Sequence, residues 1–442
     1  MKTENIPASH QPETEANSLR RTRRNSTRPL KLALTLFAVL IALTACVNDL
    51  NPGGGWSGIV DHGDYLYFGS KDGRLVRVSS TTGTFDQSWA YPPVGTDDLG
   101  EIYGTPVVSA EGVIYGSAFR CKGNECTGDV FAADAVSGQS AWASGTFKVK
   151  SRLVGSVGLG ESTLAVGTAA IDGNDVPPGF LIGLDPTVDS GKPLNEQVSS
   201  REKWRIPLNG PVWGGITVSD NIAYFGTLQH TVYAVDLSDS AGYSSPDDRI
   251  LWKFNVGGAI AGSPLVTGTN LYIGTFGNNV YSLNLSYRAQ NPDTDSLDAS
   301  TEWKFDTGAW VWAQPVLSDG VLYVANMPGE VFALDAGTGQ PRWAAPAKAG
   351  KEIVAPPFLF ESNRGPALGV ASGEKDITVV VLASGQIAGS FVTEGQGTKS
   401  SPVPHGDVIF VHTDTGQLRQ YKATTLALLN CVDVKEGGKT CK

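Results

Sequence analysis

The stretch YFGTLQHTVYAVD, from Tyr224 to Asp236, occurs twice more along the chain, as YIGTFGNNVYSLN (272–284) and YVANMPGEVFALD (323–335). In each copy a Tyr opens a short apolar strand, a turn follows, and a second apolar strand ends at Asp or Asn twelve residues after the Tyr. Self-similarity at a spacing of about 40 to 60 residues is typical of repeat architectures. Here the repeat predicts a β-propeller, because each copy supplies antiparallel strands and no helix.

The repeat also predicts the size of the propeller. Each unit supplies four antiparallel strands, which we name A to D from the axis outward. Strand B carries an aromatic residue or Ile followed by Gly-Thr or Gly-Ser. Strand C ends in Asp, and strand D carries Trp. We therefore predict an all-β fold, an eight-bladed propeller of four-stranded antiparallel blades over residues 56–434. The blades are expected at about residues 56–95, 101–148, 151–208, 209–257, 258–308, 309–349, 350–395 and 398–434.

A Trp recurs at the same place in six units. Both faces of a blade pack on neighbouring blades, so a Trp at this place can fill the gap between two sheets. Burial of such a side chain contributes about 3 kcal/mol. In the last two units Phe391 and Leu429 stand where the Trp is expected. The six structural blade tryptophans are Trp89, Trp142, Trp204, Trp252, Trp303 and Trp343.

The N-terminal residues are typical of an export signal. Residues 1–29 are polar and rich in Arg, and an uncharged, mostly apolar run from Leu32 to Ala45 follows Lys31. This order is that of a secretory signal, and the run is short for a membrane-spanning helix, which needs about 20 residues. Residues 43–46, LTAC, resemble the bacterial lipobox, in which Cys46 receives a lipid and becomes the mature N-terminus. The alternative is an uncleaved signal-anchor helix.

This interpretation divides the chain into four parts: a lipoprotein signal peptide with a long basic n-region (1–45), a lipidated linker (46–55), the propeller (56–434) and a C-terminal tail (435–442). Cleavage removes seven basic and three acidic residues, which leaves 27 Lys and Arg against 41 Asp and Glu, a net charge of −14. Such a surface repels phosphate backbones, so we expect no nucleic-acid partner.

Four cysteines remain beside the lipidation candidate. They form two pairs that are close in the sequence, Cys121 with Cys126 and Cys431 with Cys441, and the first pair is expected in a B–C loop. An even number of cysteines in an exported chain favours two local disulfides. Metal ligation and free thiols are the alternatives, although neither pair has a His at ligand spacing.

Two further motifs resemble a known family. The run D-x-x-[ST]-G-x-x-x-W occurs at 134–142 and 335–343, and A strands begin with Ser/Thr-Pro-Val-like segments at 104–107, 262–265, 314–316 and 401–403. Together with Y-x-G-T, these residues are similar to the repeat of the pyrroloquinoline-quinone (PQQ)-type propellers over roughly residues 56–434. One branch of that superfamily binds PQQ and Ca²⁺ as dehydrogenases and has adjacent cysteines, which this chain lacks. The other is the non-catalytic lipoprotein branch of the BamB type, which the overall plan resembles.

Aromatic residues gather where the A strands begin. A ring of aromatics at one channel mouth would suit a planar or sugar ligand, and packing between blades is the alternative. The candidates are Trp56, Tyr103, Trp213, Trp310 and Trp312.

Metal sites and catalytic groups are weakly indicated. His62 and His405 fall in A–B turns of blades that become neighbours when the ring closes, so they could meet, but ordinary turn residues are the favoured interpretation. Residues 291–298 alternate Asp and Asn as a calcium loop does, yet they lack its Gly and distal Glu. We therefore expect no metal, no cofactor and no catalytic residue; PQQ with Ca²⁺ belongs only to the alternative.

Insertions mark one sector of the ring. Long C–D loops are expected at about 186–203, 237–250 and 285–301, and long B–C loops at 119–129 and 169–179. Long loops in compact folds are often functional. The resulting hypothesis is a monomeric, lipid-anchored scaffold on the outer face of the cell membrane or on the outer membrane, which binds protein partners at the cell envelope. The alternatives are a PQQ-dependent dehydrogenase or a small-ligand sensor that uses the channel.

Overall fold

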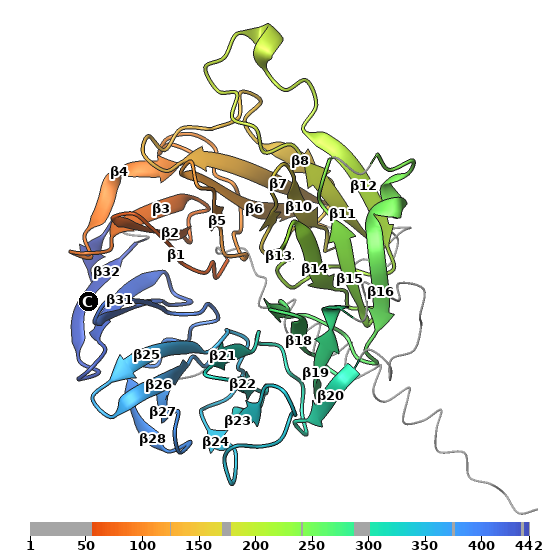
Figure 1. Cartoon of the computed structure of the whole chain (residues 1–442). Helices are drawn as coiled ribbons and strands as arrows, with labels where there is room; N and C mark the ends of the chain where they lie inside the picture. Colours follow the sequence, from red (N-terminus) through yellow and green to blue (C-terminus); the bar gives the residue numbers. More distant parts are fainter. Residues whose placement is uncertain are drawn as a thin grey trace, which may run out of the picture. The chain divides into compact units, whose positions relative to one another are not determined.

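The computed structural model describes residues 55–441 apart from 124, 170–177, 240–241, 287–300, 374–375 and 435–436. This part of the chain forms eight antiparallel sheets that follow one another around a ring (Figure 1). In each sheet the strands pair in chain order, and the first strand lies nearest the centre. The predicted all-β, eight-bladed propeller is confirmed.

The first four sheets span residues 60–255. Sheet one contains β1 (Val60–His62), β2 (Tyr65–Gly69), β3 (Leu75–Ser79) and β4 (Phe85–Tyr91). Sheet two contains β5 (Val107–Val108), β6 (Val113–Lys122), β7 (Glu125–Asp134) and β8 (Phe147–Val149). Sheet three contains β9 (Gly158–Leu159), β10 (Leu164–Gly167), β11 (Gly179–Leu184) and β12 (Glu202–Leu208). Sheet four contains β13 (Thr217–Ser219), β14 (Ile222–Gly226), β15 (Thr231–Asp236) and β16 (Ile250–Asn255).

The last four sheets span residues 265–440. Sheet five contains β17 (Leu265–Thr267), β18 (Asn270–Gly274), β19 (Asn279–Asn284) and β20 (Thr301–Asp306). Sheet six contains β21 (Val316–Ser318), β22 (Val321–Ala325), β23 (Glu330–Asp335) and β24 (Ala347–Lys348). Sheet seven contains β25 (Phe358–Ser362), β26 (Gly365–Val370), β27 (Ile377–Val381) and β28 (Ile387–Phe391). Sheet eight contains β29 (Val403–His405), β30 (Val408–His412), β31 (Gln417–Lys422), β32 (Leu428–Asp433) and β33 (Lys439–Thr440).

Short 3-10 turns interrupt two of the long C–D loops, η1 (Leu194–Glu196) and η2 (Pro246–Arg249). The short strand β33 lies in the segment expected as a C-terminal tail, where it pairs with β32. None of the helical segments in the described part of the chain is long and apolar enough to cross a membrane. The predicted signal peptide, the predicted linker up to residue 54 and the lipidation candidate Cys46 lie outside the described residues.

The sequence of each strand follows from its place in the sheet. Strand β14 is an almost continuous apolar run, because both of its faces lie against neighbouring blades. The outer strand β16 alternates: Trp252 and Phe254 are buried, whereas Lys253 and Asn255 are exposed. A cluster of buried side chains fills each gap between consecutive sheets.

The ring closes between sheets eight and one. Phe68 of β2 packs with Phe410 and Val432 of the eighth sheet, whose outer strand β32 comes from its own blade. In the described part of the chain every strand of the eighth sheet comes from blade eight itself, so the ring closes without strand exchange. We call this interface, formed by the contacts of sheet eight with sheet one, the closing seam.

The blade tryptophans join each blade to the next one. Trp303 donates its indole N–H to the carbonyl oxygen of Ala336, in the following C–D turn, at 2.9 Å, and Trp343 donates to Leu382 at 2.8 Å. Gly339, whose φ is +70°, lies against the Trp303 ring, so that a methyl group there would overlap it. The Gly of the D-x-x-[ST]-G motif thus makes room for the preceding Trp.

Two details of the predicted pattern were wrong. Trp142 and Trp343 lie in the connections before β8 and β24 rather than in the outer strands. The short C–D turn places each indole ring against the next blade before the outer strand begins to pair. Leu429 does not replace the missing Trp of blade eight, since its side chain is exposed. Gln420 of β31 takes that place: it is buried and donates from Nε2 to the Gly83 carbonyl oxygen at 3.1 Å.

Candidate functional site

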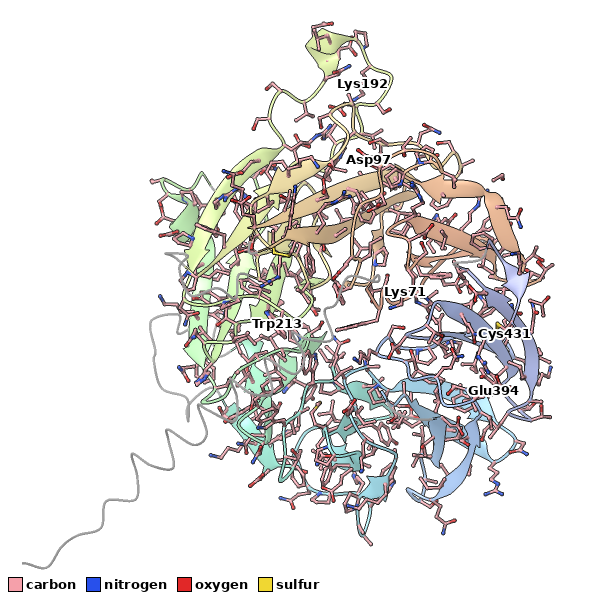
Figure 2. The ribbon with its side chains drawn as sticks, turned by 180° about the vertical axis from the view of Figure 1, so that it is seen from behind. Lys71, Asp97, Lys192, Trp213, Glu394 and Cys431 are labelled. Carbon is pink, nitrogen blue, oxygen red and sulfur yellow. A yellow bond between two sulfur atoms is a disulfide. The ribbon has the colours of Figure 1, made fainter. Side chains whose placement is uncertain are left out.

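The axial channel narrows to a neck where the A strands begin. Its cavity of about 150 Å³ is lined by residues from all eight blades. Trp56, Tyr103, Trp213 and Trp312 are among them, whereas Trp310 is not; the ring of Trp310 stacks on Phe276 with 4.9 Å between centroids. Figure 2 shows Trp213 toward the centre of the ring.

Glycines make this neck narrow. A methyl group on Gly104, Gly155, Gly214 or Gly262 would overlap the backbone of the next blade. Successive blades therefore meet backbone against backbone around the axis, which only a residue without Cβ allows.

The neck aromatics pack on one another. The rings of Trp56 and Tyr103 lie edge to face, with centroids 4.4 Å apart, and those of Trp213 and Trp312 are 6.0 Å apart. Tyr103 and Trp213 are buried. The cavity is smaller than the roughly 300 Å³ at which small-molecule pockets begin. The geometry therefore favours the packing interpretation of these residues over the ligand interpretation.

The sector predicted from the insertions contains a loop that protrudes from the ring. It joins β11 to β12 and carries η1; Lys192 marks it in Figure 2. Leu194 at its tip is 85% exposed. We call residues 186–201 the protruding loop.

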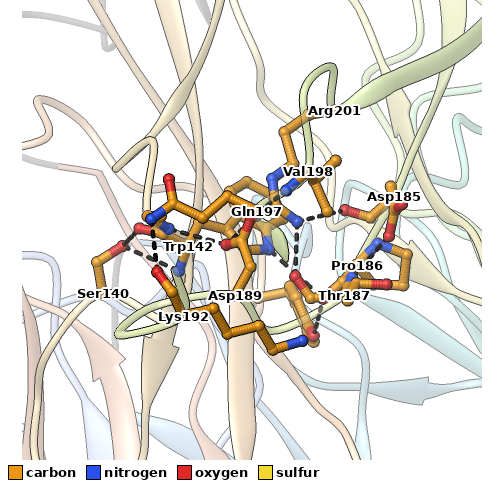
Figure 3. A network of polar contacts seen from close by, with 12 residues as sticks. Ser140, Trp142, Asp185, Pro186, Thr187, Asp189, Lys192, Gln197, Val198 and Arg201 are labelled. Atoms are coloured by element: carbon orange, nitrogen blue, oxygen red, sulfur yellow. Dashed lines mark hydrogen bonds and ion pairs between the residues drawn. The ribbon is translucent and has the colours of Figure 1, made fainter. Parts of the chain in front are cut away.

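A buried ion pair holds the base of the protruding loop (Figure 3). The Arg201 guanidinium pairs with the Asp189 carboxylate, and these side chains are only 3% and 1% exposed. The same guanidinium donates to the Thr187 carbonyl oxygen at 2.6 Å and lies over the Trp142 ring, 4.8 Å from its centroid. The loop of blade three is thereby fixed onto blade two.

Asp189 organises the backbone around it. Its carboxylate accepts N–H groups from Ala143 at 2.9 Å and Val198 at 2.7 Å, on opposite sides of the loop base. Burial alone would raise the pKa of Asp189, but these two N–H groups and the Arg201 charge outweigh burial and hold that pKa below its usual value. The carboxylate therefore stays ionised at neutral pH, and the ion pair persists.

The neighbouring long loop uses the same device. Arg249, at the end of the β15–β16 connection, lies 5.0 Å over the Trp204 ring and donates to the Ser238 carbonyl oxygen at 2.7 Å. Where the C–D turn is short, its Gly lies against the Trp of the preceding blade. In these two long loops an Arg lies over that Trp instead. We did not single out Asp189 and Arg201 from the sequence. The one available indication was that an Asp and an Arg occur within the same insertion.

The first cysteine pair lies in strands, so its placement in a B–C loop was wrong. Strands β6 and β7 continue as one long hairpin in which Cys121 is directly opposite Cys126. The structure contains this disulfide and the one between Cys431 and Cys441, as predicted. The expected 119–129 loop is thus mostly paired strand, because the disulfide and the register extend the ladder to its tip.

The histidines remain separate. His405 pairs through Nδ1 with Asp61 at 2.6 Å across the closing seam, and His62 is not part of this pair. In the described ranges no group of three or more His, Cys, Asp or Glu side chains could hold a metal ion. The candidate calcium loop at 291–298 and most of the 169–179 and 285–301 loops lie outside the described residues.

These features define a class of protein: an eight-bladed propeller with a tightly packed neck and one elaborated sector. The chain belongs to the family described as outer membrane protein assembly factor BamB, whose family model matches residues 126–427. The predicted resemblance to PQQ-like propellers is thereby confirmed.

Solved structures show the same fold. BamB from Moraxella catarrhalis superposes with a TM-score of 0.53 at 16% identity, over 75% of this chain and 85% of that chain. The computationally designed Ika8 protein superposes with a TM-score of 0.53 at 14% identity, over 84% of this chain and 97% of that chain. At these identities the likeness concerns the fold alone. A comparison with curated proteins found no match.

The quinone cofactor of the dehydrogenase branch does not fit the residues present. The neck cavity of about 150 Å³ is ringed by backbone, and the nearest pair of cysteines in the sequence, Cys121 and Cys126, is bonded in a hairpin rather than adjacent in the chain. The described residues that line the neck also include no carboxylate that could bind Ca²⁺.

Proposed function

We propose that this chain is a protein-binding scaffold at the cell envelope without catalytic activity of its own, and that it acts as a monomeric ring. The description of its family supports a role in assembly at the envelope. The protruding loop carries the proposal: its base is fixed by a buried ion pair, while Leu194 at its tip is 85% exposed. A rigid protrusion that presents an apolar side chain to solvent suits recognition of another protein, because little ordering entropy is lost on binding.

In-cell photo-cross-linking tests the scaffold function. A photoreactive residue at Leu194 should cross-link a specific partner protein, which mass spectrometry identifies. The matched control is Ile387, which is 46% exposed on β28 and lies outside the elaborated sector. Equal products at both positions, or none at either, would contradict the proposal.

We further propose that Cys46 carries the lipid anchor. The basic n-region, the short apolar run and the LTAC tetrad support this assignment. The variant Cys46→Ser should move the chain out of the membrane fraction and abolish incorporation of labelled fatty acid. A variant that stays in the membrane at its full length would instead indicate the uncleaved signal anchor.

A further inference from the structure

A groove of about 820 Å³ lies at the foot of the protruding loop. It is formed by the A–B turns of sheets two, three and four together with the C–D connections of sheets three and four. Its volume is in the range of sites that enclose a ligand or a peptide side-chain cluster, about 300 to 1,000 Å³. The neck, by comparison, offers about 150 Å³.

The floor of the groove is apolar. Val108, Leu159 and Val218, which come from three successive A strands, line it together with the buried Tyr115. Val188, from the base of the protruding loop, adds an exposed apolar side chain at one wall. Apolar contact area is therefore available across three blades.

The rim of the groove is acidic. Four carboxylates line it, from Glu111, Glu161, Asp185 and Asp239. Among the described residues that line the groove, Lys203 is the only cation, and its Nζ is engaged by Asp239 and by the carbonyl oxygen of Ser162 at 3.0 Å. Glu111 and Glu161 are exposed in the A–B turns of sheets two and three, so the groove presents net negative charge to an incoming ligand.

The charge of this groove differs from that of the groove between sheets six and seven. The equivalent groove between sheets six and seven has a volume of about 420 Å³ and is lined by Asp319, Arg342 and Arg364 among other residues. The two grooves occupy corresponding places in the repeat, between an A–B turn and the next C–D connection, yet the second groove has one lining carboxylate, from Asp319, beside two guanidiniums, one of which pairs with Asp335. The acidic rim is therefore a property of this position and does not follow from the fold.

We propose that the acidic groove binds an extended segment of the partner protein that carries Lys or Arg between apolar residues. This inference rests on the proposed scaffold function and names the chemistry that the scaffold recognises. In an extended segment successive side chains point to opposite sides, so apolar residues can face the floor while Lys or Arg side chains reach the rim. Complementary charge at an exposed rim favours association of the two partners. Added salt screens this attraction and therefore weakens binding.

Fluorescence anisotropy with the purified full-length chain tests the groove. The probe is a labelled peptide in which Lys alternates with Val; its counterpart carries Glu in place of Lys. The Lys peptide should bind to the wild-type chain. The double variant Glu111→Lys with Glu161→Lys should lower the affinity for this peptide about tenfold or more. The milder pair Glu111→Gln with Glu161→Gln should give a smaller loss in the same direction, which keeps the test valid if the charge reversal affects folding.

Asp319→Lys in the second groove is the matched control, and it should leave binding unchanged. Equal binding of the Glu peptide, an unaffected double variant, or an equal loss in Asp319→Lys would overturn the proposal.

Cross-linking separates this inference from the scaffold function. A photoreactive residue at Ser109, inside the groove, should capture the same partner as one at Leu194, through a Lys- or Arg-bearing segment that peptide mapping identifies. Capture at Leu194 without capture at Ser109 would overturn the groove proposal and leave the scaffold function standing. Absence of capture at both positions would contradict both.

Discussion

Replacing Arg201 by Met is expected to lower the free energy of unfolding by about 3 to 5 kcal/mol, because it leaves the Asp189 carboxylate buried without its cation. Both side chains are almost fully covered, at 3% and 1% exposure. The variant also loses the donor to the Thr187 carbonyl oxygen and the guanidinium that covers Trp142. Urea unfolding followed by Trp fluorescence measures the loss.

Two comparisons make this result specific. The surface pair of Arg205 and Glu202 has side chains that are 36% and 32% exposed, so Arg205→Met should cost less than about 1 kcal/mol. The double variant Asp189→Leu with Arg201→Met should recover much of the stability, because it removes both charges together. A loss in Arg201→Met no larger than that in Arg205→Met would show that the buried pair does not hold the loop.

The same variant connects stability to function. Hydrogen exchange in Arg201→Met should rise across the protruding loop while the sheets stay protected, because the ion pair holds the two ends of the loop together and positions Asp189 to accept the Ala143 N–H of blade two. If recognition needs a rigid loop, the same variant should reduce cross-linking at Leu194.

The ring itself was predictable from local pattern. The Tyr that opens strand B, the Asp that ends strand C and the Trp that follows recur at nearly fixed spacing, and each has a local reason to be there. Packing between sheets requires the Trp, and the C–D turn requires the Gly at positive φ, as at Gly339. Blade eight departs from the pattern because Gln420 occupies the space that a Trp fills in the other blades, and it donates a hydrogen bond to Gly83 of blade one.

The contacts that shape the site could not be predicted in the same way. The insertions at 186–203 and 237–250 located the elaborated sector, but nothing in their spacing indicates that Arg201 and Arg249 fold back over Trp142 and Trp204. Such contacts depend on the path of a whole loop. The neck aromatics illustrate the opposite case: four of the five predicted residues line the neck and Trp310 does not, yet backbone contact at Gly155 and Gly214 closes the space that a ligand would need.

A decrease in pH should weaken the closing seam through His412. This residue of β30 is fully buried against sheet one: its Nδ1 lies 3.2 Å from the Ser57 carbonyl oxygen and its ring packs on Phe68. Burial lowers the pKa of His412 to about 4; the Ser57 hydrogen bond partly opposes this shift, and the Lys71 charge adds to it. The neutral imidazole, with its proton on Nδ1, is the form that fits the seam.

The sign of the pH effect follows from this lowered pKa. In the unfolded chain a His has a pKa of about 6.5, so below that pH the unfolded state binds a proton that the folded state excludes. Stability contributed by His412 is therefore present above pH 6.5 and is lost as the pH falls toward 4. A shift of this size corresponds to about 3 kcal/mol at the acidic end.

Urea unfolding at several pH values between about 7.5 and 4.5 measures the effect. The variant His412→Asn retains a side-chain N–H donor for Ser57 but does not titrate, so its stability should depend less steeply on pH across this window. His62→Asn is the matched control and should keep the steep dependence, because His62 ends strand β1 beside Gly112 of blade two, outside the closing seam. Identical slopes for the wild type and His412→Asn would show that the seam does not sense pH through this residue.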